Sequence, residues 1–524
     1  MVICVAAGRA LSAETVQTAV LVYGATSSGV VAAVAAARQG ASVVLAEPGW
    51  HVGGMTSGGL GQTDIGNKGA IGGIAREFYR RLGRHYGQPE AWTFEPSVAE
   101  ETFTAMLREV KVPVYFQQRI ASVKLAGRRI LEATMENGNV FRAQVFIDTT
   151  YEGDLMARAG VSFTVGREAN SQYHETLDGI RAQTPAHQFL VPVDPYVRRG
   201  DPASGLLPLI QPRDGGRPGD GDRRVQAYNF RLCLTQNPAN RRPIAPPADY
   251  DPGRYELLAR YLEALVAVGR HPRLGDVMHI QKMPNGKTDI NNNGAFSTDD
   301  IGASYDYPDA GYTARARIWQ AHADYTRGFL HFLASSPRVP ENIRAEMQSW
   351  GLCRDEFPDT GGWPHQLYVR EARRMVTDYV MTEHNCRGIL HPADSIGLAA
   401  YGMDSHNCQR IVKDQHVENE GDVQVHGFSP YPIAYRAITP RATECENLLV
   451  PVCLSATHIA YGSIRMEPVF MVLGQSAATA ACLAVQRRAP VQQVPYPDLR
   501  QRLQRDRQIL EWPATPKPTA TQPK

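Results

Sequence analysis

The stretch GATSSG at residues 24–29 decides the fold that this sequence predicts. It follows an apolar run over 19–23 and precedes an alanine-rich run over 30–38. A second apolar run over 42–46 ends in Glu47. Strand, glycine turn, helix and strand in this order predict a βαβ unit of a parallel sheet. In such a unit the helix N-terminus binds the pyrophosphate of a dinucleotide, and the carboxylate binds the ribose hydroxyls.

The turn departs from the usual dinucleotide pattern at its second glycine position, where Thr26 stands. Gly24 permits the tight turn and Gly29 permits close packing of helix on strand. A side chain at Thr26 either crowds the phosphates or donates its hydroxyl to one of them. Because a glycine-rich hexapeptide is weak evidence alone, the flanking strand and helix favour a nucleotide site over an ordinary turn.

Length and composition set the broad class of the protein. The 524 residues exceed one ordinary core, so we expect two domains or one domain with a large insertion. The chain has 43% hydrophobic and 21% charged residues, as in a folded globular protein. Its formal net charge is +2 and its basic residues are scattered, which argues against a nucleic-acid partner. No apolar run reaches the roughly 18 residues of a membrane span.

Both ends of the chain differ from the rest. Residues 1–7 are apolar and are followed by ALSA at 10–13, so we interpret residues 1–13 as the remnant of a signal peptide. This predicts a periplasmic or secreted protein, with a cytoplasmic one as the alternative. The segment 512–524 is rich in Pro and Thr and is expected to be a disordered tail. Eight cysteines without regular spacing do not decide the compartment.

The pattern predicts an α/β protein with a Rossmann-like nucleotide-binding domain that is split by an α+β substrate domain. We expect the nucleotide-binding domain over 19–165 and 441–495, and the inserted domain over 166–440, where Pro, Arg, Asp and Gly are frequent. Beyond the βαβ start, the expected helices are 98–109, 255–268, 314–333, 371–381 and 474–487, and the expected strands lie over 112–145 and 447–452.

Three further segments favour FAD over NAD as the dinucleotide. The glycine-rich segment 53–60 follows the second strand, where backbone approaches the flavin ring in flavoproteins. The strand at 146–154 runs into acidic residues, where the chain returns to the nucleotide. A helix that begins near Gly474 would aim its N–H groups at the pyrimidine edge of the flavin. Each segment also has a competing interpretation: a flexible loop for 53–60, a surface turn for 146–154, and a helix that serves only packing for the segment at Gly474. The expected cofactor-binding residues are Gly24, Thr26, Ser27, Ser28, Gly29, Glu47, Pro48, Gly53, Gly54, Met55, Thr56, Asp148, Glu152, Gly474, Gln475 and Ser476.

Together these motifs resemble the bacterial FAD-dependent oxidoreductases with a glutathione-reductase-like FAD domain, which are distantly similar to succinate dehydrogenase and fumarate reductase flavoproteins. The resemblance covers most of the chain and rests on five segments: 24–29, HVGGMTSGGL at 51–60, MPNGKTD at 283–289, LYVREARR at 367–374, and 456–475. It implies FAD as the cofactor, a small-molecule substrate and an electron acceptor of unknown identity. Members are mostly without a known substrate, and some occur with carbohydrate-degradation genes.

A flavin-dependent dehydrogenase needs a base for the hydroxyl or amine proton, and histidine suits neutral pH. We place His458 first, because it lies between an expected strand and the expected flavin-facing helix. His406 and His384 are alternatives from the inserted domain. His458 is equally open to a structural role as a hydrogen-bonded core residue. His51 lies where relatives attach flavin covalently, but its local pattern differs from theirs.

Arginine supplies the other catalytic candidates. Arg370, Arg374 and Arg465 offer rigid guanidinium groups that bind a carboxylate, orient a polar substrate or donate a proton. The competing interpretation is a structural ion pair with Glu371 or Glu467, which we favour for Arg374. The catalytic candidates are therefore His458, His406, Arg370 and Arg465.

Two reactions stay open. The first is oxidation of a CH–OH group in a polar, carbohydrate-like substrate, on whose ring Trp363 and Tyr368 could stack. The alternative is a fumarate-reductase-like transfer of hydride to or from a carbon–carbon bond, with an arginine as proton donor. A flavin-binding protein without turnover is a third class. Neither a metal site nor a nucleic-acid site is expected from these motifs.

Overall fold

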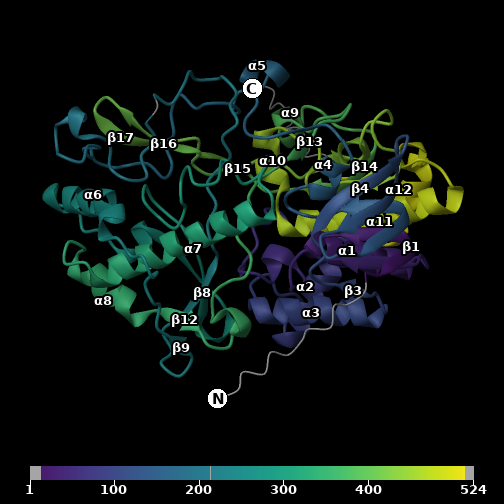
Figure 1. The fold of residues 1–524 in the computed structure, drawn as a ribbon, viewed down its shortest axis with the longest axis horizontal. Helices are drawn as coiled ribbons and strands as arrows, with labels where there is room; N and C mark the ends of the chain where they lie inside the picture. Colours follow the sequence, from purple (N-terminus) through teal and green to yellow (C-terminus); the bar gives the residue numbers. More distant parts are fainter. Residues whose placement is uncertain (1–12, 213, 514–524) are drawn as a thin grey trace, which may run out of the picture.

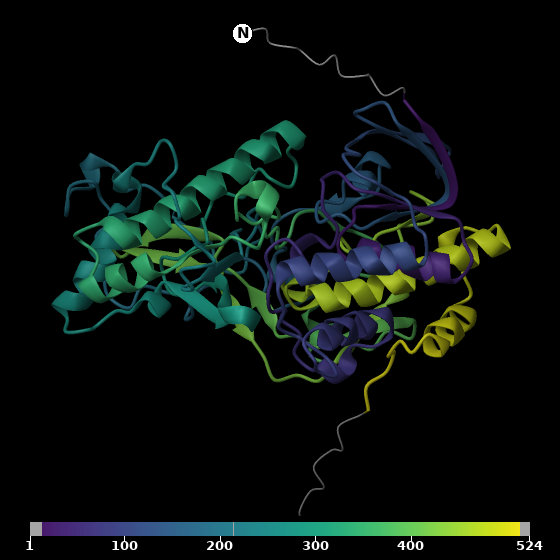
Figure 2. The same cartoon turned by 90° about the horizontal axis from the view of Figure 1, so that it is seen from below.

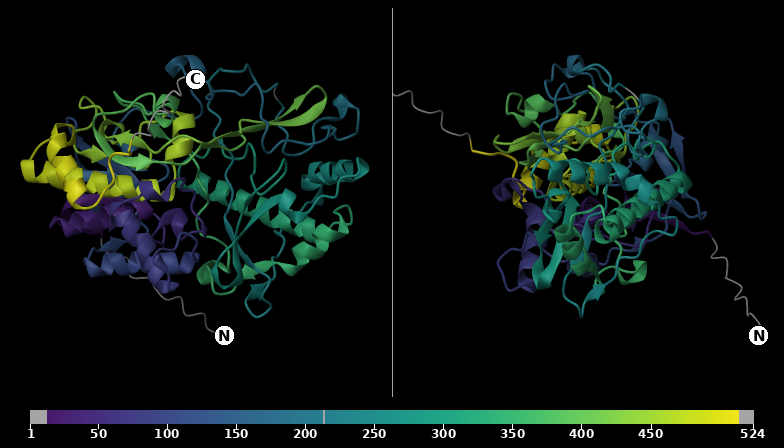
Figure 3. Two further views of the ribbon diagram at one scale, coloured as in Figure 1. Left: turned by 180° about the vertical axis from the view of Figure 1, so that it is seen from behind. Right: turned by 90° about the vertical axis from the view of Figure 1, so that its left-hand side faces the viewer.

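The computed structural model describes residues 13–212 and 214–513, and Figure 1 shows two lobes side by side. The first lobe, at the right of Figure 1, holds the purple N-terminal and yellow C-terminal segments, and the second holds most of the teal middle of the chain. Figure 3 shows the same division from behind. Most of the expected signal segment 1–13 and of the expected tail 512–524 lies outside the described residues. Both therefore stay predictions.

A sheet of mainly parallel strands forms the centre of the first lobe. In spatial order its strands are β3 (Val114–Tyr115), β2 (Val43–Ala46), β1 (Thr15–Tyr23), β6 (Val140–Asp148), β5 (Arg129–Met135) and β4 (Ile120–Ala126), with β20 (Leu448–Leu449) also paired to β6. Strands β3, β2, β1, β6 and β20 are parallel, whereas β5 and β4 pair antiparallel. Val20 and Val22 point into one core cluster, and Leu21 and Tyr23 into another. Burial on both faces explains why this strand is a continuous apolar run.

Helices α1 (Ser27–Arg38) and α11 (Glu467–Arg487) pack against each other and so join the two ends of the chain. Figure 2 shows the yellow C-terminal helices beside purple and blue N-terminal segments. They approach closely, because a Cβ at Gly474 would lie 2.3 Å from the carbonyl oxygen of Ser28. By length and composition, α11 is the one helix among the described residues that could cross a membrane, but 94% of its apolar window is buried inside the protein. The expected helix start near Gly474 is wrong, since α11 begins at Glu467 and Gly474 packs in its interior.

The predicted fold class, a Rossmann-like domain split by an α+β insertion, is confirmed. Helix α3 (Pro96–Glu109) matches the expected one, but α2 (Gly73–His85) was not predicted, because two glycines at its start suggested a loop. The remaining elements of this lobe and its borders are α4 (Asp154–Arg158), β7 (Phe163–Thr164), α5 (Asn170–Tyr173), α9 (Glu383–Cys386), β14 (Ser395–Ala399), β19 (Tyr431–Ala434), α10 (His458–Ile464) and α12 (Tyr496–Arg505).

The second lobe is built around a five-stranded sheet and three helices. The strands, in spatial order, are β10 (Met278–Lys282), β11 (Lys287–Asn292), β8 (Leu232–Thr235), β12 (Gly351–Cys353) and β9 (Arg241–Arg242), and the helices are α6 (Glu256–Ala267), α7 (Tyr312–Ser335) and α8 (Glu341–Ser349). Two antiparallel ribbons also belong to the insertion: β15 (Met403–Ser405) with β18 (Val423–Val425), and β16 (Gln409–Lys413) with β17 (His416–Glu420).

The expected helix over 371–381 is absent. This segment is extended, and β13 (Arg374–Met375) pairs antiparallel with β7. Its charged residues point to separate buried partners: Arg373 pairs with Asp154, and Arg374 with Glu168. Tertiary ion pairs therefore override the helical propensity of the sequence. The expected strand over 447–452 shrinks to the two residues of β20.

Candidate active site

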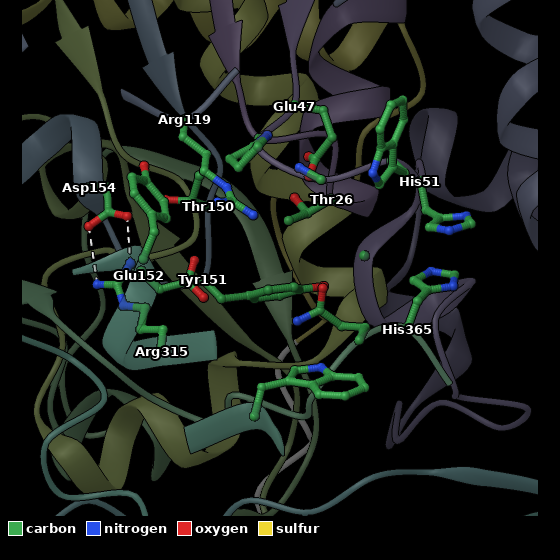
Figure 4. A pocket seen from close by; sticks show the side chains of 18 of the residues that line it. Thr26, Glu47, His51, Arg119, Thr150, Tyr151, Glu152, Asp154, Arg315 and His365 are labelled. Carbon is green, nitrogen blue, oxygen red and sulfur yellow. Dashed lines mark hydrogen bonds and ion pairs between the residues drawn. The ribbon is translucent and has the colours of Figure 1, made fainter. Parts of the chain in front are cut away.

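A cleft of about 570 Å³ lies between the two lobes, and its inner wall is formed at the carboxyl ends of β1, β2 and β6 (Figure 4). In open parallel sheets ligands bind at such a position, where the strand order reverses. The opposite wall comes from the insertion, with Trp319 of α7 among its residues. Arg315 of α7 pairs with Asp154 of α4 at 2.6 Å, so that this wall is fastened to the first lobe.

The turn at 24–29 forms the floor of the cleft. Gly24 has a φ of 98°, and a Cβ at Gly29 would lie 1.9 Å from the carbonyl oxygen of Gly24, so both positions require glycine. Thr26 has a φ of −60° and caps α1: its hydroxyl accepts from Gly29 N at 3.3 Å and donates to Thr149 O at 2.7 Å. Threonine is therefore tolerated in place of glycine, and its hydroxyl is used within the fold. The first turn of α1 carries no acidic residue that would oppose binding of an anion at its N-terminus.

Glu47 lies in the cleft at the end of β2. Its carboxylate accepts backbone hydrogen bonds from Ala25 and Gly49, each at 2.6 Å. Desolvation raises the pKa of Glu47 to about 7. No lysine or arginine pairs with it among the described residues. Further hydrogen-bond donors, such as the two hydroxyls of a ribose, would stabilise the ionised form of this buried carboxylate.

Two stacked histidines stand at one side of the cleft (Figure 4). The rings of His51 and His365 are 3.7 Å apart and nearly parallel. His51 contacts Glu100 and Asp359, each at 3.0 Å, and its hydrogen bond to Glu100 raises its pKa. Burial lowers the pKa of His365 to about 3, and both of its ring nitrogens lack a partner within the described part of the chain. A ligand in the cleft would satisfy this buried polar ring.

A second group of polar residues surrounds the ring of Tyr368. The guanidinium carbons of Arg370, Arg465 and Arg231 lie 4.7, 5.7 and 6.0 Å from its centroid. Arg465 also donates to the Tyr368 hydroxyl at 3.0 Å. We call these four residues, with Asp289, Asp299, Asp404 and His406, the Tyr368 cluster. It adjoins the glycine-rich segment, because Asp289 accepts hydrogen bonds from the backbone of Gly61 and Gln62 at 2.9 and 3.1 Å.

Each arginine of the Tyr368 cluster has a carboxylate partner. Arg231 pairs with Asp289 through two bonds of 2.8 Å. The other two pairs are Arg370 with Asp299 at 3.1 Å and Arg465 with Asp404 at 3.0 Å. Within these three pairs the positive and negative charges balance. A fourth carboxyl, Asp64, interacts with Arg231 and Arg465, and burial raises its pKa. Even so, one N–H group of each arginine has no hydrogen-bond partner within the described residues: Arg231 Nη1, Arg370 Nε and Arg465 Nε.

His406 provides the proton acceptor of the Tyr368 cluster. Its Nδ1 lies 2.7 Å from Asp299, which fixes the tautomer with the proton on Nδ1 and the lone pair on Nε2. Nε2 is 3.8 Å from Asp404, beyond hydrogen-bond distance. Burial, together with Arg370, lowers the pKa of His406 to about 4. The imidazole is therefore neutral at pH 7 and able to accept a proton.

The structure brings together three of the four catalytic candidates, His406, Arg370 and Arg465, and separates His458 from them. His458 begins α10; its Nδ1 is 2.8 Å from Glu371, and its Nε2 is 2.9 Å from Ser405. Both nitrogens are thus used within the protein, so His406 replaces His458 as the better candidate base. Glu371 follows Arg370 and Ser405 precedes His406, so His458 holds together the two segments that carry these residues.

The other candidate side chains have structural contacts. His384 Nε2 is 3.1 Å from His174 O, and Arg374 pairs with Glu168 and Glu371. Glu467 accepts from Ser27, Thr56 and Tyr151 and so ties the start of α11 to the start of α1.

The expected cofactor residues divide into two groups. Those that line the cleft are Gly24, Thr26, Glu47, Pro48, Gly54 and Glu152. Those that lie behind it are Ser27, Ser28, Gly29, Gly53, Met55, Thr56, Asp148, Gly474, Gln475 and Ser476. The last three lie in the middle of α11, because the helix starts earlier than expected. Gln475 there accepts a hydrogen bond from Ile74 N. Asp148 caps its own turn by accepting from Thr150 and Met156.

Sequence reasoning missed several residues that the structure places at these sites. Trp50 lies on the cleft with its indole 64% exposed, where a flat base could stack. His365, Arg231 and Asp299 were not singled out. Trp50 had a usable signal, an aromatic residue directly after the β2 carboxylate turn. The other three lie in the insertion, where no local pattern marks them.

A family model described as FAD dependent oxidoreductase matches residues 19–503. No curated protein matches the chain. Solved structures with partial similarity include L-amino acid deaminase from Proteus vulgaris, with 14% identity over 30% of this chain and 53% of that chain and a TM-score of 0.25. THI4 from Thermovibrio ammonificans has 17% identity over 29% and 66% of the two chains and a TM-score of 0.23. The chain covers less than two thirds of these structures, and their low TM-scores add nothing to the family match.

Proposed function

The chain belongs to the family of FAD-dependent oxidoreductases, and we propose that it oxidises a CH–OH group of a neutral, polyhydroxylated substrate such as a sugar or polyol. FAD binds in the cleft between the lobes, and the substrate lies against the Tyr368 cluster. The choice of substrate class depends on the observation that every arginine of that cluster is paired with an aspartate.

The cleft residues fit FAD. The N-terminus of α1 above Gly24 would hold the pyrophosphate, and Glu47 would accept the ribose hydroxyls. The unpartnered nitrogens of His365 offer a donor and an acceptor to a heteroaromatic ring in the cleft. Bound FAD supplies a hydride acceptor, which none of the side chains can replace.

The charge balance of the Tyr368 cluster supports a neutral substrate. A carboxylate substrate would have to compete with Asp299 for Arg370 and with Asp404 for Arg465. A hydroxyl group carries no such penalty, because it can accept from a free guanidinium N–H and donate to His406 Nε2 at the same time. Sugars and polyols present such hydroxyls on adjacent carbons.

His406 would remove the hydroxyl proton as the C–H bond breaks. Its neutral imidazole accepts the proton at Nε2, and Asp299 at Nδ1 stabilises the resulting positive charge. Arg370 and Arg465 would orient the substrate oxygen through the N–H groups that have no partner in the fold. Each step uses a side chain whose position the structure describes.

A fumarate-reductase-like activity is the second candidate. The same unpartnered N–H groups on Arg231, Arg370 and Arg465 favour it, since they could bind the carboxylate of an unsaturated acid and donate a proton to its carbon. This second activity requires a negatively charged substrate to bind beside three aspartates, which would repel it.

Flavin reduction separates the two candidates. The purified protein, shown to contain FAD by its visible spectrum, is mixed anaerobically with sugars, polyols and hydroxy acids. We expect neutral sugars or polyols to bleach the flavin. Bleaching by hydroxy acids alone would keep the CH–OH oxidation but overturn the neutral substrate class. Turnover of unsaturated dicarboxylates, seen only when dithionite-reduced viologen is supplied, would instead favour the second candidate. A protein that no compound of the panel reduces and that turns over no unsaturated dicarboxylate would contradict both proposals.

A further inference from the structure

The second lobe contains a cavity of about 610 Å³ that shares no lining residue with the cofactor cleft. Its polar lining includes His187, Tyr261, His271, Asn293 and Gln424, together with one residue of each charge, Arg270 and Asp276. The volume lies in the range of roughly 300–1,000 Å³ that is typical of small-molecule sites. Neither the cofactor site nor the proposed catalytic groups account for it.

The cavity shares its wall with the Tyr368 cluster. Gln424 of β18 lies directly opposite Asp404 of β15, and side chains of such a pair share one face of the ribbon. Asp404 is the partner of Arg465. On the other side of the wall, the carbonyl oxygen of His187 accepts from Asn407, the residue after His406, at 3.5 Å. Two independent connections therefore place the cavity next to the catalytic candidates.

His187 is held in a strained and specific geometry. Its φ of 48° lies in the left-handed region, which few residues other than glycine adopt, with histidine, asparagine and aspartate the more frequent exceptions. Asn419 Nδ2 donates to its carbonyl oxygen at 2.8 Å, and Gly294 N donates to its Nδ1 at 3.0 Å. With Nδ1 acting as acceptor, the proton of the neutral ring lies on Nε2. Nε2 has no hydrogen-bond partner within the described part of the chain.

We propose that this cavity binds the unreacting part of the substrate, a neutral glycan of two or three sugar units, and that His187 Nε2–H donates to one of its hydroxyls. The inference rests on the proposed function, because the cavity would hold only the unreacting end while His406, on the neighbouring segment, would act on the other end. Amide and imidazole groups beside the aromatic ring of Tyr261 offer the hydrogen bonds and the flat face that such a ligand needs. The substrate and FAD then reach the Tyr368 cluster from different cavities.

Direct binding tests this inference independently of turnover. The FAD-loaded protein is titrated by calorimetry with neutral mono-, di- and trisaccharides of glucose, galactose and mannose. We expect a di- or trisaccharide to bind more tightly than its monosaccharide. His187→Asn keeps a residue that tolerates the left-handed region but removes the imidazole donor, and we expect it to weaken binding about tenfold.

His174→Asn is the matched control, because His174 also has a left-handed φ, 57°, but ends α5 outside the cavity. Gln424→Leu provides a second test at an exposed position and should also weaken binding. Equal affinity in the wild type, the His187 variant and the Gln424 variant would overturn the inference, as would the absence of binding by every saccharide. If saccharides bind but none bleaches the flavin, the cavity assignment stands and the proposed oxidation fails.

Discussion

The cofactor cleft and the Tyr368 cluster differ in what they leave for a ligand. Among the described residues, no lysine or arginine pairs with Glu47 in the cleft, and both ring nitrogens of His365 lack a hydrogen-bond partner. In the Tyr368 cluster each arginine already has an aspartate. The cleft therefore depends on its ligand to complete its hydrogen bonds and charges, as expected for a site that keeps one cofactor. The cluster pairs each arginine within the protein and leaves one N–H group of each arginine without a partner, as expected if the neutral substrate that we propose binds there.

The cleft is most sensitive at Gly29. We expect Gly29→Ala to abolish FAD binding, because its Cβ would lie 1.9 Å from the Gly24 carbonyl oxygen and would separate α1 from β1. The flavin content of the purified protein and its melting temperature measure this effect. Gly275→Ala is the control, since a Cβ there meets no atom within 4 Å. Normal flavin content in the Gly29 variant would show that the cleft does not need this close contact.

His406 should matter for turnover and not for the cofactor. We expect His406→Gln to lower kcat by about 10²- to 10⁴-fold while FAD stays bound, because the proton acceptor is lost. The wild-type rate should fall only as the pH drops towards 4, where His406 takes up a proton. Steady-state kinetics and the flavin spectrum measure the two effects, with His384→Gln as the control. A fully active His406 variant would remove the Tyr368 cluster from the reaction.

His458 is expected to act on structure and not on proton transfer. We expect His458→Leu to destabilise the protein by about 2–4 kcal/mol, since Glu371 and Ser405 would both lose a buried partner. His458→Asn can still donate to Glu371 and should keep the pH profile of kcat unchanged. Chemical unfolding and pH-rate measurements test these statements. If the folded Asn variant loses the acidic limb of the pH profile, His458 and not His406 is the base.

Glu47 should give the smallest effect, visible as a pH dependence of FAD affinity. Its pKa of about 7 lies above the ordinary 4.5, so the folded apoprotein holds this proton more tightly than the unfolded chain does. The contribution of Glu47 to the free energy of unfolding is therefore fully present below pH 4.5 and is lost as the pH rises through 7. Ribose hydroxyls favour the ionised form, so FAD should bind more tightly as pH rises towards and through 7, by at most about tenfold per pH unit. Titration of the apoprotein with FAD measures this slope, and Glu47→Gln should flatten it. An equal slope in that variant would assign the titration to another group.

The sequence by itself determined the local parts of the cofactor site. The turn at 24–29, the strand that ends in Glu47 and the alanine-rich helix are short-range features, and each follows from steric and hydrogen-bond rules along the chain. Together with the motif resemblance, they were enough to predict the Rossmann-like fold and FAD. Where the prediction failed, as at Gly474, glycine served helix packing between distant segments, which a single sequence does not distinguish from a helix start.

Only the tertiary structure decided which polar side chains share a site. Arg231, Asp299, Arg370, His406 and Arg465 come from five different segments of the chain, and no spacing connects them. The structure also showed that both ring nitrogens of His458 are hydrogen-bonded within the protein. His406 and His187, in contrast, each keep one ring nitrogen without a hydrogen-bond partner within the described residues. The physical reason is that a residue type fixes what a side chain can donate or accept, whereas its neighbours in space decide which of those capacities are already used.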